Sequence, residues 1–199
     1  MDRIVEFYFD YGSPNAYLAW HRLPAIAARS GAEIVYRPML LGGVFKGTGN
    51  HSPMEIAVKR PNGRNDLVRF ATRHNVPLRF NPFFPVNTLQ LMRGAVAAEA
   101  DGALLPYSEA IFAGMWRDAR NLGDPAEVRA VLDFAGLDAD RFAARIAEEP
   151  VKERLKAYTE AAIAREVFGA PTFFVGEEMF FGQDRLDFVE EALNGRSYL

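Results

Sequence analysis

The sequence predicts an α/β protein that starts with a strand, a tight turn and a helix. Apolar residues alternate over positions 5–9, which is the pattern of a strand with a buried face. Ser13 and Pro14 follow a glycine, and both are preferred where a helix begins, since proline lacks an N–H that would have no partner there. Near the other end, Pro171 precedes a β-branched and aromatic run, a second short strand and a final helix. These two pieces are the halves of a thioredoxin-like fold.

The first half continues as a helix and a second strand. We expect a helix over residues 14–30, with Gly31 as its stop and a bend at Pro24. Residues 33–37 predict the next strand, which Pro38 ends. Strand, helix and strand at this spacing form a βαβ unit, so the two strands should be parallel.

The middle of the chain predicts helices joined by irregular segments. Residues 39–51 are rich in glycine and are expected to form a loop. A polar segment with Pro61 and Gly63 precedes a helix over about 65–74, and residues 77–86 are extended and rich in proline. Further helices are expected from a cap at Asn87 or Thr88 to about Ala100, then over residues 105–117, 125–134, 139–148 and 152–167, the last ended by Gly169.

The length suits one domain that carries an insertion. With 199 residues and 49% hydrophobic content, the chain can bury a sizeable core. We expect residues 1–40 and 168–199 to form the thioredoxin-like domain and residues 41–167 to form an inserted, all-helical domain.

Composition excludes several classes of function. A net charge of −3 without a basic stripe argues against nucleic-acid binding. The sequence contains no run of about 18 apolar residues, so it predicts no membrane span. The opening residues Met1, Asp2 and Arg3 lack the basic-then-apolar layout of a secretion signal, so we expect a cytoplasmic protein.

The chain contains no cysteine. This absence excludes disulfides, thiolate metal sites and dithiol redox chemistry. Any sulfur that the protein uses must therefore arrive with a small molecule. The histidines His21, His51 and His74 lack metal-ligand spacing, so no metal site is expected.

Ser13 has two interpretations. A serine before a proline at a helix start is in most proteins only a cap. Ser13 also lies at the positive end of a helix, just beyond the carboxyl end of a strand, where α/β proteins bind ligands and especially anions. A nucleophilic serine would need a base, and no histidine is evidently related to Ser13; the G-x-S-x-G motif is also missing.

Motifs along nearly the whole chain point to a family. They are FYFDYGSPNAYLA, RPMLLGGVFKGTGN, FNPFFPVNTLQLMR, the AGL of residues 135–137 and VFGAPTFFVGEEMFFGQDRLDFVEEAL. In these motifs the chain resembles the 2-hydroxychromene-2-carboxylate isomerases and their relatives, the kappa-class glutathione transferases. Both belong to the disulfide-bond-forming branch of the thioredoxin superfamily. The resemblance implies glutathione as cofactor and a homodimer.

The resemblance also implies where glutathione binds. The fold makes the bond before Pro171 cis, so Ala170 should turn its N–H and C=O outward to pair with a bound peptide. The segment Phe181, Gly182, Gln183 and Asp184 would hold the γ-glutamyl end. An ordinary reading also fits, because Pro171 could simply start a strand and Asp184 or Gln183 could cap the last helix.

A second set of residues would contact the organic substrate. By resemblance, Lys46 meets the carboxylate of an aromatic acid, and Asn50 lies in the same wall. Arg60, Asn62 and Asn87 are further candidates. The family commonly has a tyrosine where Asn62 stands, so this departure leaves the ring system of the substrate open. A loop lysine such as Lys46 is in most proteins only solvated.

Ser13 would act as a hydrogen-bond donor to the glutathione thiolate. A free thiol has a pKa of about 8.5, and lowering it by about two units needs about 2.7 kcal/mol of preference for the anion. A charge-assisted hydrogen bond from the hydroxyl gives about 1.5–3 kcal/mol, and a helix N-terminus up to about 2. These two effects suffice without a metal or a general base.

The family reaction interconverts 2-hydroxychromene-2-carboxylate and trans-o-hydroxybenzylidenepyruvate, a step in the breakdown of naphthalene-type aromatics. Addition of the thiolate would turn a rigid double bond into a rotatable single bond, and its expulsion would return glutathione unchanged. Two alternatives stay open: a kappa-like glutathione transferase, which keeps the sulfur on the product, and a non-catalytic thioredoxin-like module that binds peptides.

Overall fold

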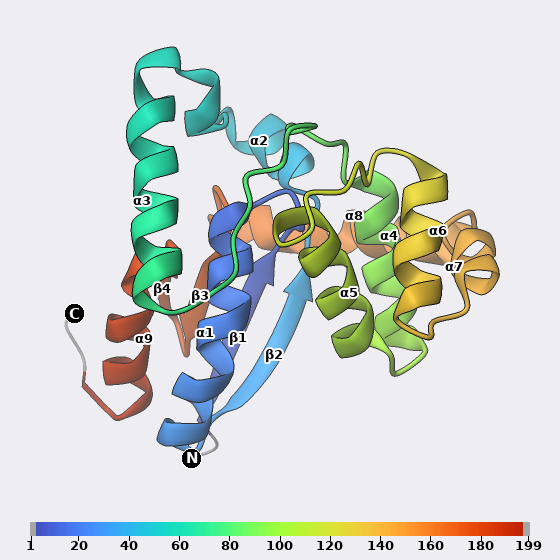
Figure 1. The fold of residues 1–199 in the computed structure, drawn as a ribbon. Coiled ribbons are helices and arrows are strands. Elements are labelled where there is room, and N and C mark those ends of the chain that lie inside the picture. The colour runs from blue at the N-terminus through green and yellow to red at the C-terminus, as the bar shows by residue number, and fades with distance from the viewer. Residues whose placement is uncertain (1–2, 197–199) are drawn as a thin grey trace.

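A four-stranded mixed sheet lies at the centre of the protein in the computed structural model, which describes residues 3–196 (Figure 1). The strand order is β2-β1-β3-β4; β1 pairs with β2 in parallel, and β3 pairs antiparallel with both β1 and β4. This order joins the predicted βαβ unit to the predicted hairpin, as a thioredoxin-like fold requires. The strands are β1 (Ile4–Phe9), β2 (Glu33–Pro38), β3 (Thr172–Val175) and β4 (Glu178–Phe181).

Some expectations fall on residues that are not described. Met1 and Asp2, which contribute to the expected cytoplasmic location, and residues 197–199 of the predicted thioredoxin-like domain lie outside the described residues.

Both faces of the sheet are covered by helices. Val5, Phe7 and Phe9 are fully buried and pack in one cluster with residues of α1 (Pro14–Ser30) and α9 (Leu186–Leu193). Tyr8 points the other way and packs with residues of α2 (Leu41–Thr48) and α8 (Glu149–Ala164). The alternation of side chains along a strand thus separates the two helical layers. In Figure 1, α1 lies in front of the strands and α8 passes behind them.

The helix α1 follows its sequence signals. Ser13 is the N-cap residue, Pro14 is the first helical residue and Gly31 takes the left-handed conformation with φ of 60°. Pro24 lies inside the helix. The predicted start and end of the helix are confirmed, and the bend at Pro24 stays a prediction.

The remaining helices lie between β2 and β3 in the sequence. In Figure 1 the helices α4 to α7 gather at the right of the sheet, and α3 lies at the left, above α9. The division into a thioredoxin-like domain and an inserted helical domain stays a prediction, and α2 and α8 pack directly on the sheet. The bounds are α3 (Arg60–Arg73), α4 (Leu89–Ala100), α5 (Leu104–Trp116), α6 (Pro125–Phe134) and α7 (Ala139–Arg145), with short 3-10 helices at Pro53–Glu55, Ala57–Lys59 and Gln183–Arg185.

The predicted glycine-rich loop over residues 39–51 is wrong, because most of it forms α2. Two of its glycines, Gly43 and Gly47, face α8. A Cβ atom at Gly43 would lie 2.9 Å from Cγ2 of Thr159, and one at Gly47 would lie 2.6 Å from Cδ1 of Ile163. These glycines therefore allow two helices to approach closely and do not indicate a loop.

Three predicted helix bounds need correction. The helix α3 begins at Arg60, because Pro61 falls in its first turn, where proline is tolerated, and Gly63 does not interrupt it. The helix α7 ends at Arg145 instead of near residue 148. The helix α8 starts at Glu149 and ends at Ala164, so it lies three residues earlier than predicted at both ends.

Gly169 does not terminate α8. Glu166 takes the positive φ of 62° after the helix end. Gly169 instead faces Phe181, since a Cβ atom there would lie 2.6 Å from Cε2 of that ring.

No helix within residues 3–196 has both the length and the apolar character needed to cross a membrane.

The packing of α2 on α8 makes a paired prediction. We expect Gly43→Ala to lower the free energy of unfolding by about 1–3 kcal/mol through overpacking. Thr159 cannot rotate away freely, because its hydroxyl bonds to the Leu40 N–H and to the Leu155 carbonyl. Gly42→Ala in the same helix is the control, because nothing lies within 4 Å of its Cβ position. It should stabilise the protein by about 0.4–1 kcal/mol. Urea denaturation measures both, and equal effects would contradict the close approach.

Candidate functional site

The hydroxyl of Ser13 joins the two ends of the chain. Its oxygen accepts a hydrogen bond from the Ala16 N–H at 3.1 Å, as an N-cap does, and its hydrogen goes to the carbonyl oxygen of Ala170 at 2.9 Å. Ser13 is buried, with 5% of its surface exposed. The bond between Ala170 and Pro171 is cis. The capping interpretation is therefore correct, but it uses only one lone pair of the hydroxyl.

The expected free carbonyl at Ala170 needs correction. This carbonyl is occupied, because it accepts the hydrogen of Ser13. The backbone N–H of Ala170 makes no hydrogen bond within residues 3–196. A bound peptide would thus find one free donor at Ala170 and would have to replace Ser13 at the acceptor.

A buried carboxylate, which the sequence analysis did not single out, lies beside this turn. Asp10 has no exposed surface. It accepts hydrogen bonds from the Gly12 N–H at 2.8 Å, the Leu41 N–H at 2.8 Å and the Thr88 hydroxyl at 3.0 Å. Burial raises the pKa of Asp10, and these three donors oppose the rise. The available signal was an acidic residue at the end of an apolar strand, next to a glycine turn.

Tyr11, between Asp10 and Gly12, is held by hydrogen bonds at its carbonyl and at its hydroxyl. The indole N–H of Trp116 donates to the carbonyl of Tyr11 at 2.7 Å. The Tyr11 hydroxyl pairs with the hydroxyl of Ser108 at 2.7 Å, and all three residues are fully buried. The turn that presents Ser13 is consequently held from several sides.

The predicted γ-glutamyl segment lies next to the cis-proline turn. The N–H of Gly182 donates to the carbonyl of Pro171 at 3.0 Å, and Gly182 has a φ of 105°. Gln183 is buried, and its backbone and side-chain oxygens accept from Nη1 of Arg22 at 2.7 and 3.0 Å. Arg22 belongs to α1, the helix that Ser13 caps. One helix thus contacts both parts of the predicted glutathione site.

The predicted capping role of this segment is wrong. Arg185 precedes α9, and no side chain caps that helix, so neither Gln183 nor Asp184 fills the role. The oxygen of Gln183 is instead occupied by an arginine, and the exposed Asp184 pairs with Arg185 at 2.8 Å. Phe181 lies at the edge and packs on Phe168, with ring centroids 4.5 Å apart.

One of the predicted substrate residues contacts the segment before Ala170, and another adjoins a hydrogen-bond partner of Asp10. The side chain of Asn50 donates to the carbonyl of Phe168 at 2.8 Å, two residues before Ala170. Asn87 accepts from the Leu89 N–H at 3.0 Å, the first N–H of α4, and it adjoins Thr88, which is the N-cap residue of α4 and the partner of Asp10.

The other predicted substrate residues lie on α2 and α3. Lys46 is exposed in the last turn of α2. Arg60 donates to the carbonyls of residues 54 and 55, and Asn62 donates to Asp66 at 3.0 Å. The hydrogen bonds of Arg60 and Asn62 thus stay within residues 54–66.

Two of the histidines pack against aromatic rings. His21 packs edge-on against Tyr17, with ring centroids 4.7 Å apart, and burial lowers its pKa. His74 stacks with Phe70. Within residues 3–196, no group of three histidine, aspartate or glutamate side chains could hold a metal ion.

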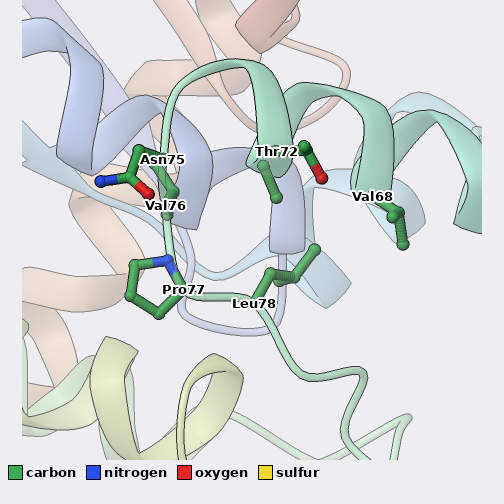
Figure 2. Close-up of a pocket in the computed structure, with 7 residues that line it drawn as sticks. Val68, Thr72, Asn75, Val76, Pro77 and Leu78 are labelled. Carbon is green, nitrogen blue, oxygen red and sulfur yellow. The ribbon is translucent and has the colours of Figure 1, made fainter.

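Two surface hollows lie away from the predicted site residues. One, of about 350 Å³, lies between the end of α3 and the segment after it (Figure 2). It is lined by Val68, Ala71, Thr72, Asn75, Val76, Pro77 and Leu78. The other, of about 300 Å³, lies on the sheet and is lined by Ile4, Glu6, Val35, Arg37, Phe174 and Gly176. Neither lining includes a residue predicted to bind glutathione or substrate, so the geometry around Ser13 is the better guide to the site.

Comparisons with known proteins identify the fold and the family of the chain. A model of the DSBA-like thioredoxin domain family matches residues 4–194. A 2-hydroxychromene-2-carboxylate isomerase of Sphingobium xenophagum is 32% identical over 195 residues, which cover 97% of this chain and 99% of the relative. The solved structure of a selenomethionine 2-hydroxychromene-2-carboxylate isomerase is 34% identical, with a TM-score of 0.86, and the match covers 96% of this chain and 94% of that one. Glutathione S-transferase kappa 1 of Homo sapiens is 28% identical over 207 residues, 97% of this chain and 92% of the relative.

The contact between Arg22 and Gln183 makes a testable prediction. We expect Arg22→Met to lower the free energy of unfolding by about 1–3 kcal/mol, because it leaves two buried oxygens of Gln183 without a partner. Arg29→Met is the matched control on the same helix. Arg29 pairs with Glu190 at the surface, so its loss should change stability little. Urea denaturation compares the two variants, and an equally mild Arg22→Met would contradict the anchoring role.

Proposed function

The chain belongs to the DSBA-like thioredoxin domain family and to its 2-hydroxychromene-2-carboxylate isomerases, and from this membership we propose that it is a glutathione-dependent isomerase of an aromatic carboxylic acid. One observation carries the proposal. In a chain without cysteine, the hydroxyl at the mouth of α1 bonds to the residue before the cis-proline.

The absence of cysteine requires a borrowed sulfur. A thioredoxin-like site without its own thiol has no dithiol chemistry. Glutathione is a peptide that carries a thiol, and the name of the human relative includes it. We therefore propose that glutathione takes the position that a cysteine would fill at the start of α1.

Ala170 would bind the backbone of glutathione in the manner of an added strand. Its free N–H would donate to the peptide, and its carbonyl would accept an N–H of the peptide in place of the Ser13 hydrogen. Gly182, Gln183 and Asp184 would then receive the γ-glutamyl end, because Gly182 bonds directly to Pro171. Phe181 and Pro171 would line the apolar side of the same groove.

This exchange would release the single hydrogen of Ser13 for the thiolate. The Ala170 carbonyl keeps a donor, so the hydroxyl turns to the sulfur without leaving an acceptor unpaired. A charge-assisted bond is worth about 1.5–3 kcal/mol, against about 0.5–1.5 for a neutral one. With up to about 2 kcal/mol from the N-terminus of α1, a large part of the bound thiol would ionise at neutral pH.

The thiolate would then act as a reversible nucleophile. A bond forms between the sulfur and one carbon of the conjugated double bond, and the electron pair moves into the conjugated system. The former double bond rotates, the electron pair returns, and the carbon–sulfur bond breaks to release glutathione unchanged. We propose that Lys46, Asn50 and Asn87 contact the aromatic acid, with Arg60 and Asn62 further from the sulfur. By the same resemblance we propose a homodimer.

A kappa-like glutathione transferase is the second candidate. It is favoured by the 28% identity to the human transferase across nearly the whole of both chains. In that reaction the sulfur stays on the product. Both candidate reactions would use the thiolate, and they differ in whether the carbon–sulfur bond breaks again.

Ser13→Ala tests the role of the hydroxyl. We expect kcat/KM for isomerisation at neutral pH to fall by about 10-fold to 100-fold, since the variant loses a bond of about 1.5–3 kcal/mol to the anion. The pKa of the bound thiol should rise, which the ultraviolet absorbance of the thiolate measures against pH. Ser52→Ala is the control, because Ser52 also caps a helix, through the Met54 N–H, and has no part in the site. Undiminished turnover in Ser13→Ala would refute the thiolate role.

The fate of glutathione separates the two candidates. An isomerase should convert many equivalents of the aromatic acid while the concentration of free thiol stays constant. A thiol assay run beside a spectrophotometric assay of the acid measures both. Loss of thiol in proportion to turnover would identify a transferase.

A further inference from the structure

The starts of three helices meet at the carboxylate of Asp10. The Gly12 N–H lies just before Ser13, which caps α1, and the Leu41 N–H belongs to the first residue of α2. The Thr88 hydroxyl belongs to the residue that precedes α4. These donors lie 2, 31 and 78 residues from Asp10 in the sequence.

Asp10 takes the place of the missing N-cap of α2. The N-cap residue Leu40 has no side-chain oxygen, and no side chain of its own segment caps the helix. The first N–H groups of a helix need acceptors from elsewhere. Asp10 accepts from Leu41, while the hydroxyl of Thr159 accepts from Leu40 at 3.0 Å.

The hydrogen bonds of Asp10 need an ionised carboxyl group or another group of the same shape with two acceptor oxygens. Its two oxygens accept from two backbone N–H groups and one hydroxyl, and within residues 3–196 it forms no ion pair. The positive ends of the helices stabilise a negative charge there. An asparagine has one acceptor oxygen, so its amide nitrogen would face either the Gly12 or the Leu41 N–H.

The same three segments carry the residues of the proposed reaction. The Gly12 turn presents Ser13, α2 carries Lys46 and leads to Asn50, and Asn87 adjoins Thr88. Small errors in the relative position of reacting groups lower rates strongly. Resting on the proposed function, we propose that Asp10 is a positioning residue that fixes the distance between the glutathione sulfur at Ser13 and the aromatic acid on α2.

The proposal predicts a separation of binding from turnover. Ala170 and the Gly182–Asp184 turn have no hydrogen bond to Asp10, so glutathione should still bind when Asp10 is changed. Turnover should fall, because α2 and the Ser13 turn no longer share one anchor. A residue with a purely structural role would lower stability without this separation.

The test compares Asp10→Asn with Tyr107→Phe. Tyr107→Phe removes a different buried hydrogen bond, the one from the Tyr107 hydroxyl to the Leu91 carbonyl, keeps the aromatic ring, and leaves the hydrogen bonds of the Ser13 turn and of α2 in place. Both variants and the wild type are measured well below their unfolding temperatures. The readouts are the Kd of glutathione by calorimetry, kcat/KM for the aromatic acid, and hydrogen exchange of the Leu41 N–H.

We expect Asp10→Asn to lower kcat/KM by about 10-fold to 100-fold, to leave the Kd of glutathione near that of the wild type, and to accelerate exchange at Leu41. Tyr107→Phe should change none of the three. Equal kcat/KM in the two variants would overturn the proposal, and so would unchanged exchange at Leu41 in Asp10→Asn.

A second pair keeps the test decisive if Asp10→Asn fails to fold. Thr88→Val removes the hydroxyl that donates to Asp10, and Thr88→Ser keeps it. Thr88→Val should lose more turnover than Thr88→Ser at equal glutathione affinity; equal losses would overturn the proposal. Failure of the proposed function looks different, because the wild type itself would then show no glutathione-dependent turnover, and the role of Asp10 in the reaction would fall with it.

Discussion

The hydrogen bond from Ser13 to Ala170 is the interaction on which the site depends. The sheet makes it possible. Because β1 and β3 are antiparallel neighbours, with Tyr8 opposite Thr172, the end of β1 lies beside the start of β3. The turn after β1 and the cis-proline turn before β3 must then meet, although 157 residues separate them. A hydroxyl has one hydrogen to give, so this contact forces a choice between the Ala170 carbonyl and any anion that enters.

Local signals predicted the parts of the fold that depend on neighbours in the sequence. The start of α1 at Ser13 and Pro14, its end at Gly31 and the parallel pairing of β1 with β2 follow from capping, chain geometry and spacing, and all three are confirmed. The contact of the two ends followed from the fold class that these elements define. The occupied carbonyl of Ala170 could not be predicted, because it depends on which way one hydroxyl points.

Long-range contacts explain where predictions from the local sequence were wrong or incomplete. The glycines of α2 indicated a loop because their partners, Thr159 and Ile163, lie more than a hundred residues away. Asp10 gave only a local signal, an acidic residue at the end of an apolar strand, whereas two of its three donors come from distant segments. Gln183 was one of two predicted caps of the last helix, and only the fold shows that Arg22 of α1 occupies its side-chain oxygen. In each case, tertiary packing gave the residue a partner that the local pattern did not contain.

Under the proposed function, buried residues would carry the chemistry and exposed residues would select the substrate. Ser13, Asp10 and Gln183 are buried; Ser13 and Gln183 each bond to one distant segment and Asp10 bonds to two, so a change at any of them affects residues far away in the sequence. Lys46, Arg60 and Asn62 are exposed, and the hydrogen bonds of the latter two remain local. Under the proposed function, substitutions on α2 and α3 would therefore alter which aromatic acid binds and would leave the proposed thiolate site at Ser13 intact. An isomerase and a transferase that share this fold would accordingly differ in the exposed wall and keep the junction of β1, α1 and the cis-proline turn.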